Sequence, residues 1–64
     1  MVYLSPRERE VLKLVAEGQT NRQIAIMLNL SEHTVKNYMR AIRNKFGTES
    51  RTEAVAVALR AGLI

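Results

Sequence analysis

The stretch from Ser31 to Phe46 repeats its apolar residues with the period of an α-helix, and this feature most constrains the fold. At 3.6 residues per turn, these apolar side chains fall within roughly 60° of arc; they are Val35, Met39, Ile42 and Phe46. The opposite side carries only Lys, Arg, His and Asn, with no acidic residue between Glu32 and Glu49. We therefore expect a helix anchored by one side, with a basic surface on the other.

Helix-capping signals divide the rest of the chain. Three segments read as capping boxes, in which a hydroxyl side chain and a Glu or Gln three residues later satisfy free backbone N–H groups. They begin at Ser5, Thr20 and Ser50. Glycine or asparagine, which tolerate a left-handed backbone, follow the helical segments. The sequence predicts an all-α fold, a four-helix bundle in one domain (1–64), with helices at about 6–17, 21–28, 32–46 and 51–61.

The first two helices have apolar faces that predict a shared core. The expected core residues are Val11, Leu12, Leu14, Val15, Ile24, Ala25 and Leu28, with Met27 partly covered and Leu4 packed from before the first cap. About three residues separate the second helix from the third, which is typical of a helix-turn-helix whose second helix reads DNA. The small side chain of Ala25 would let these two helices approach closely near Val35.

The fourth helix is apolar nearly all round, which indicates burial on more than one side. Val55 and Leu59 lie on one face of this helix, while Val57 points roughly opposite, flanked by Ala54 and Ala61 at helical spacing. A chain of 64 residues is too small to bury such a helix alone, so a second copy is the economical explanation. The expected dimer interface is Ala54, Val57, Ala58 and Ala61. The alternative is a short alanine-rich helix whose small residues are exposed without consequence.

Composition favours a polyanionic partner and gives no support for catalysis. The formal net charge is +4, and the pI is about 10.1. Without cysteine there is neither a disulfide nor a thiolate metal site. The only histidine, His33, has no thiol partner, and the carboxylates are scattered. We expect no enzyme activity, catalytic residue, metal or cofactor, and no membrane association, since no apolar run could span a bilayer.

The basic stripe contains side chains of the kinds that can pair with DNA bases and phosphates. Arg40 can pair with guanine O6 and N7, and Asn37 with adenine N6 and N7. Lys36 suits either a base or a phosphate. Thr34, Arg43 and Lys45 are better placed for phosphate. The alternative interpretation of the stripe is a solvated helix face that happens to be basic.

The ordered set of motifs resembles the LuxR/FixJ-type, or GerE-like, helix-turn-helix domain over nearly the whole chain. The matching residues are 4–12, Gly18, 21–25, 28–31, 34–36, Ile42, 45–47 and 50–54. The resemblance implies a cytoplasmic, nucleoid-associated bacterial transcription regulator that binds inverted or direct half-sites as a dimer through its fourth helix. It implies base contacts from Lys36, Asn37 and Arg40. Backbone contacts or support of the motif are implied for Asn21, Thr34, Arg43, Lys45 and Arg51.

The sequence departs from the family pattern at Tyr38, where histidine is common. We expect a tyrosine there to pack edge-on and to reach a phosphate with its hydroxyl. Family members usually carry an N-terminal receiver or ligand-binding domain, so we expect either an excised effector domain or a naturally short member. The runner-up hypothesis is a helical protein-interaction module that docks onto another regulator or RNA polymerase, the latter being a further candidate partner of a DNA-binding domain.

Overall fold

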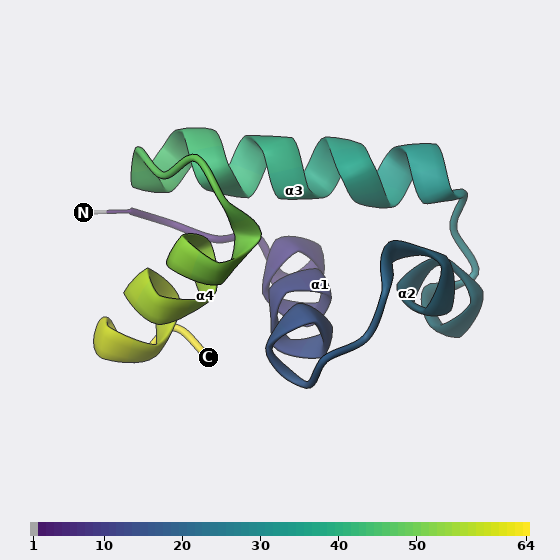
Figure 1. Ribbon diagram of the computed structural model, residues 1–64, viewed down its shortest axis with the longest axis horizontal. Helices are drawn as coiled ribbons and strands as arrows, with labels where there is room; N and C mark the ends of the chain where they lie inside the picture. The colour runs from purple at the N-terminus through teal and green to yellow at the C-terminus, as the bar shows by residue number, and fades with distance from the viewer. Residues whose placement is uncertain (1) are drawn as a thin grey trace.

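The computed structural model describes residues 2–64; Met1, the first residue of the expected domain, lies outside the described residues. Four helices follow one another along the chain (Figure 1): α1 Pro6–Ala16, α2 Asn21–Leu28, α3 Glu32–Phe46 and α4 Arg51–Arg60. This confirms the predicted all-α fold, with α1 and α4 each ending one residue earlier than expected. In the part of the chain described, no helix has both the length and the apolar character needed to cross a membrane.

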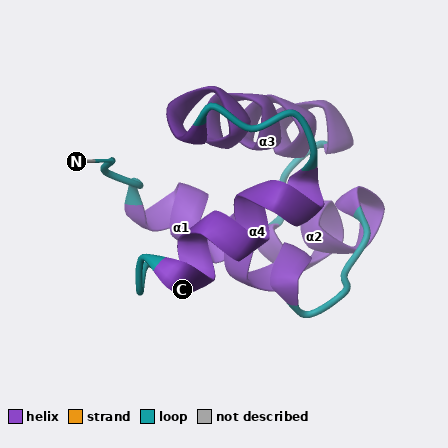
Figure 2. Cartoon of the chain, turned by 60° about the vertical axis from the view of Figure 1, so that its left-hand side comes forward, coloured by secondary structure: helices purple, strands orange, loops and turns teal. Residues whose placement is uncertain are grey.

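The α3 helix lies along one side of the molecule, and the other three helices lie together on the opposite side (Figures 1 and 2). It packs against α1, α2 and α4. The α1 helix also contacts each of the other three, whereas α2 and α4 have no close backbone approach within residues 2–64. One side of α3 therefore anchors on the whole domain while the other stays outside.

Two complete capping boxes start α1 and α2, as predicted. The Ser5 hydroxyl accepts from Glu8 N at 3.1 Å, and Glu8 Oε1 accepts from Ser5 N at 2.8 Å. The same pair of bonds joins Thr20 and Gln23 at 3.1 and 2.8 Å. Because each box satisfies N–H groups that have no partner inside the helix, it fixes where the helix begins.

The α3 and α4 helices each have a serine cap. Ser31 Oγ accepts from Thr34 N at 3.0 Å. Ser50 Oγ accepts from Glu53 N at 3.1 Å, but the predicted capping box is incomplete there. Glu53 Oε1 accepts from the Ser50 hydroxyl at 3.3 Å instead of from its backbone N–H.

Left-handed residues separate α3 from its neighbours, as predicted. Asn29 ends α2 with φ 56°, and Gly47 ends α3 with φ 67°. Asparagine adopts this conformation at low cost, and glycine has no Cβ to oppose it. The turn between α2 and α3 is therefore short and specified locally, as a helix-turn-helix requires.

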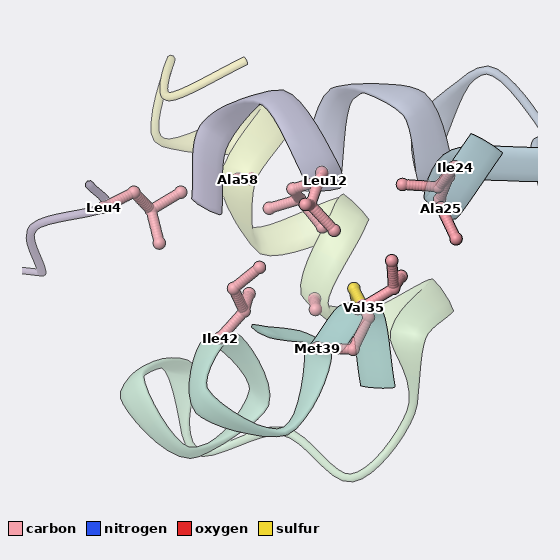
Figure 3. Close-up of a cluster of buried hydrophobic side chains, with 10 residues drawn as sticks. Leu4, Leu12, Ile24, Ala25, Val35, Met39, Ile42 and Ala58 are labelled. Carbon is pink, nitrogen blue, oxygen red and sulfur yellow. The ribbon is translucent and has the colours of Figure 1, made fainter. Parts of the chain in front are cut away.

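The core gathers between α3 and the other helices (Figure 3). Its buried apolar residues are Leu4, Val11, Leu12, Ile24, Ala25, Val35, Met39, Ile42, Ala54 and Ala58. Leu14, Val15, Leu28 and Phe46 pack at its edge. The predicted core of α1 to α3 is thus confirmed, including the contribution of Leu4. Met27, expected to be partly covered, is 56% exposed.

The core face of α4 differs from the prediction. Ala54 and Ala58 are 0% exposed in the single chain, while Leu59 is 57% exposed. Leu59 therefore lies outside the core, and the buried Ala54 and Ala58 are not available to a second copy as predicted. The physical reason is space, because α4 packs against both α1 and α3, and small side chains let helices approach closely at a dense core.

We predict that Ala58→Leu destabilises the domain by about 1–3 kcal/mol, because the larger side chain has to enter a filled core. Ala56 lies two residues before Ala58, at a half-buried position of α4. The substitution Ala56→Leu should change the free energy of unfolding by no more than about 0.5 kcal/mol. Urea denaturation followed by circular dichroism measures both. Equal effects of the two substitutions would contradict the observed orientation of α4.

Candidate nucleic-acid interface

The outward side of α3 presents the three residues predicted to contact bases. Lys36, Asn37 and Arg40 are all exposed. Val35 and Met39, which lie on the other side of the helix, are buried in the core. Because the buried stripe fixes the rotation of α3 about its axis, these three side chains project together from a rigid element.

A hollow of about 230 Å³ flanks this surface on the side of α3 that faces α2 and α4. We call it the basic hollow; its lining residues are Asn21, Lys36, Met39, Arg40, Arg43 and Arg51. Arg43 and Arg51 are half-buried, whereas Lys36 and Arg40 are exposed at its rim. Four cations and no carboxylate line it, so the local potential is positive.

Arg51 links two of the segments that surround the basic hollow. Its Nη1 donates to Asn21 Oδ1 at 2.9 Å, and its Nη2 donates to the Gln19 carbonyl oxygen at 3.3 Å. These bonds join the start of α4 to the start of α2, two helices without a close backbone approach. Of the two roles that the family resemblance implied for Asn21, support of the motif is the one that this geometry displays.

Thr34 and Tyr38 lie on the other flank of α3, beside α1. They share a shallow hollow of about 280 Å³ with Glu8, Asn37 and Ala41. Thr34 Oγ1 lies 2.8 Å from Ser31 Oγ, within the helix cap. Tyr38 is half-buried and packs at the edge of the core. The predicted backbone-contacting residues are therefore divided between two flanks of the same helix.

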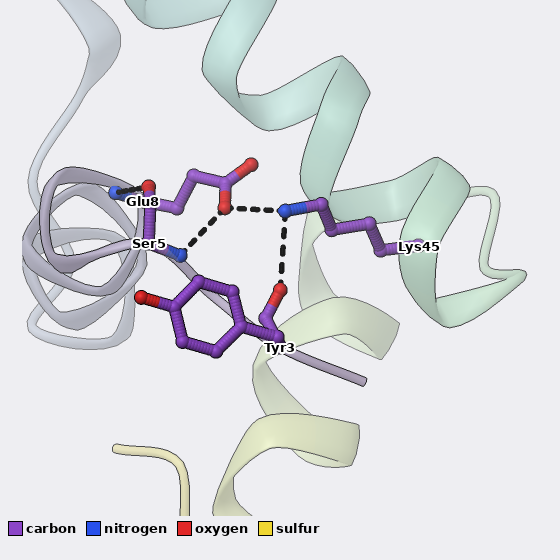
Figure 4. Close-up of polar contacts among 4 residues, drawn as sticks. All are labelled: Tyr3, Ser5, Glu8 and Lys45. Atoms are coloured by element: carbon purple, nitrogen blue, oxygen red, sulfur yellow. Dashed lines mark hydrogen bonds and ion pairs between the residues drawn. The ribbon is translucent and has the colours of Figure 1, made fainter. Parts of the chain in front are cut away.

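Lys45 links the end of α3 to the start of α1 and to the segment before it (Figure 4). Its Nζ donates to Glu8 Oε1 at 2.6 Å and to the Tyr3 carbonyl oxygen at 3.1 Å. The ammonium group is thus paired with a largely buried carboxylate, while the Lys45 side chain itself stays 39% exposed, so a contact with the DNA backbone stays a prediction. On the helix, Lys45 lies between the apolar and the polar stripe, where a long stem reaches a neighbouring helix.

The same contacts keep Glu8 ionised. Burial alone would raise its pKa, but the hydrogen bonds from Lys45 and Ser5, together with the positive charge of Lys45, outweigh burial. The pKa therefore lies below its ordinary value of 4.5. Sequence reasoning found the capping role of Glu8 and missed this ion pair, because residues 37 positions apart share no local signal.

The charged and imidazole groups described do not form a metal site. No cluster of three His, Cys, Asp or Glu residues occurs within residues 2–64. The polar groups that this surface offers are the cations and amides of α3 and its flanks, which are able to bind anions and hydrogen-bonding edges.

The family model for bacterial regulatory proteins of the luxR family, named GerE, matches residues 2–58. The chain belongs to this LuxR family. It forms the family's helix-turn-helix DNA-binding domain, as the sequence motifs predicted. The family consists of transcription regulators and is not enzymatic, which agrees with the expectation from the residues.

Two similar proteins are longer than this chain. The transcriptional regulatory protein YdfI of Bacillus subtilis is 44% identical over 61 residues, covering 95% of this chain and 29% of YdfI. The DNA-binding transcriptional activator DevR/DosR of Mycobacterium tuberculosis is 47% identical over 55 residues, covering 86% of this chain and 25% of that protein. The chain thus spans 29% and 25% of the lengths of these two relatives.

Solved structures share the arrangement of helices. The transcription factor GerE superimposes with a TM-score of 0.91 at 35% identity, covering 94% of this chain and 90% of GerE. VqmA in its complex with ligand and DNA, from Vibrio cholerae, gives a TM-score of 0.90 at 35% identity, covering 98% of this chain and 28% of VqmA. These agreements confirm the predicted family and its fold.

We predict that Glu8→Gln lowers stability at neutral pH by about 1–3 kcal/mol, because it removes a charge-assisted hydrogen bond to Lys45. Since the folded pKa of Glu8 is lowered, its stabilisation is complete above the unfolded pKa and is lost as pH falls through the folded pKa. The difference between wild type and variant should therefore shrink below pH 4.5.

Urea denaturation across pH measures this difference. Glu10→Gln serves as the matched control, since the exposed Glu10 makes only a 3.9 Å contact with Arg7. A Glu8→Gln difference that is the same in acid as at neutral pH would show that the carboxylate charge does not stabilise the fold.

Proposed function

We propose that this domain binds double-stranded DNA sequence-specifically, with α3 in the major groove, as the DNA-binding part of a bacterial transcription regulator. The observation that carries the proposal is the exposure of Lys36, Asn37 and Arg40 on one side of α3, opposite its buried stripe. The major groove admits a helix and displays the donors and acceptors that these side chains complement.

Each base-contacting residue has a distinct role in this proposal. Arg40 donates two hydrogen bonds to guanine O6 and N7, and Asn37 pairs with adenine N6 and N7. Lys36, nearer the start of the helix, contacts a base or the adjacent phosphate. The outward side of α3 has no aromatic or aliphatic cluster of the kind that dominates protein–protein contacts, which favours DNA over a protein partner there.

Phosphate contacts come from both flanks of α3. Arg43 and Arg51 face one strand from the basic hollow. The hydroxyl of Tyr38 and the first turn of α3 at Thr34 face the other strand, where backbone N–H groups and the helix dipole attract an anion. Such contacts set the register of the helix on the duplex and carry no sequence information of their own.

The proposed dimer forms through the outward side of α4. Ala54 and Ala58 are excluded because they are buried within the chain. Val57 and Ala61 remain from the predicted interface. Leu59 is the largest exposed apolar group on α4 but lies roughly opposite Val57 around the helix, so the proposed contact is centred on the side that carries Leu59. Two copies then place two α3 helices on successive half-sites, as dimeric helix-turn-helix proteins do.

A second proposed contact involves α2. Ile26 is 72% exposed and Met27 is 56% exposed, side by side on this helix. Adjacent exposed apolar residues are typical of a protein-binding surface, and RNA polymerase is the partner that a regulator bound at the nucleoid, in the bacterial cytoplasm, would meet there. This contact supplements DNA binding and does not replace it.

We predict that Arg40→Ala weakens binding to the preferred duplex by about 1–3 kcal/mol and relaxes the preference at one base position. Selection of duplexes from a random pool, followed by fluorescence anisotropy on the selected sequence and its single-base variants, measures both effects. Arg43→Ala is the matched control. It should weaken binding evenly and reduce the slope of log affinity against log salt by about one.

Three outcomes would contradict this arrangement. Loss that is equal on all sequences for Arg40→Ala would reassign Arg40 to the DNA backbone. Salt-sensitive binding that survives the combined substitution of Lys36→Ala and Arg40→Ala would place DNA on another side of the molecule. Absence of binding at low salt, with circular dichroism showing a folded domain, would favour the protein-interaction function.

We predict that Leu59→Asp raises the dimer dissociation constant at least about tenfold, because it places a charge in the proposed apolar contact. Ile26→Asp, a substitution of another exposed apolar residue, on α2, should leave dimerisation unchanged. Analytical ultracentrifugation in the presence of a two-half-site duplex measures both. Equal effects of the two substitutions would remove α4 as the interface.

A further inference from the structure

We propose that the basic hollow is a preformed site for one tetrahedral oxyanion, and that Asn21 is the positioning residue that orients Arg51 within it. The ligand is a phosphate of the DNA backbone or, in the free domain, inorganic phosphate or sulfate. The inference rests on the proposed function where the ligand is DNA, and it stands independently where the ligand is a free anion.

The shape of the hollow separates it from an ordinary basic surface. Residues of α2, α3 and α4 line it together. Arg43 and Arg51, half-buried, form its inner part, whereas Lys36 and Arg40 stand exposed at the rim. Cations at two depths surround an entering anion, whereas a flat surface offers charge from one direction only.

Arg51 is oriented before any ligand arrives. One N–H of Nη1 and one of Nη2 bind Asn21 Oδ1 and the Gln19 carbonyl oxygen. A guanidinium has five N–H donors in a rigid plane, so these bonds leave three for a ligand. Because the neutral amide of Asn21 fixes the guanidinium without neutralising it, the full charge stays available and little conformational entropy is lost on binding.

The lining of the hollow strengthens the attraction between its cations and an anion. Met39 contributes an almost fully buried apolar side chain to the lining, which lowers the local dielectric and strengthens attraction to an anion. No carboxylate lines the hollow. Oriented planar donors suit the several oxygens of phosphate or sulfate, and hydrogen bonds between charged partners of this kind are about twice as strong as neutral ones. Chloride, a single sphere, gains little from that geometry.

The test is a titration of the isotopically labelled domain with sodium sulfate, compared with sodium chloride at matched ionic strength. We expect saturable shifts of the Arg51 Nε–H and of backbone amides near residues 21, 43 and 51 with sulfate, and small non-saturating shifts with chloride. Identical responses to the two salts, which would mean diffuse screening or an adventitious ion only, would overturn the proposal.

Three variants locate the site. Arg43→Gln should weaken sulfate binding about tenfold by removing one charge-assisted contact. Arg9→Gln removes the same charge from an exposed position on α1 and should leave sulfate binding unchanged. Asn21→Ala keeps every charge and should still weaken sulfate binding, with the chloride response unaltered. Equal effects of Arg43→Gln and Arg9→Gln would overturn the site, and an unaltered Asn21→Ala affinity would overturn the positioning role.

DNA tests the same site separately. In a selected duplex, neutral methylphosphonate linkages replace one phosphate at a time. One position should weaken wild-type binding about tenfold while weakening Arg43→Gln little further, because the partner is already absent. If the domain binds sulfate but not DNA, the anion site is supported and the proposed DNA-binding function is overturned. If the domain binds DNA, but binds no sulfate and shows no sensitive phosphate, the proposed function is supported and the anion site is overturned.

Discussion

Burial of one stripe of α3 is the constraint on which the rest of the structure depends. Val35, Met39 and Ile42 are anchored on three other helices, and this fixes both the position of α3 and its rotation. A reading surface needs that rigidity, because a side chain displaced by an ångström loses a bidentate contact. With 64 residues, the domain has one helix that supplies a large part of its core and also the surface proposed to meet DNA.

The local parts of this fold could be predicted from sequence because their causes are local. Ser5 and Thr20 act on groups three residues away, Asn29 acts through its own backbone, and the two stripes of α3 follow from its period alone. The exposed positions of Lys36, Asn37 and Arg40 follow in the same way. Such features need no knowledge of what packs on them.

Contacts between residues distant in sequence could not be predicted. The space between α1, α3 and α4 places alanine, not a larger apolar side chain, in the core at residues 54 and 58, so neither is available to a second copy. Charge alone gave no sign that Lys45 pairs with a carboxylate 37 residues away. No period in the sequence encodes the distance between two helices, so the division of cations between the fold and the exposed surface becomes visible only in three dimensions.

Arg51 takes part in two structures at once. It is the first residue of α4, and its guanidinium is bonded to the loop and helix that precede α3. A rotation of α4 about its axis would therefore either break those bonds or move Asn21 and Gln19 together with the helix. A contact on the far side of α4 that rotated this helix would thus move the same guanidinium that lines the basic hollow. By thermodynamic linkage, such a contact and an anion in the hollow would each change the affinity of the other by the same factor, so pairing of two domains and binding of DNA would be coupled through a single side chain.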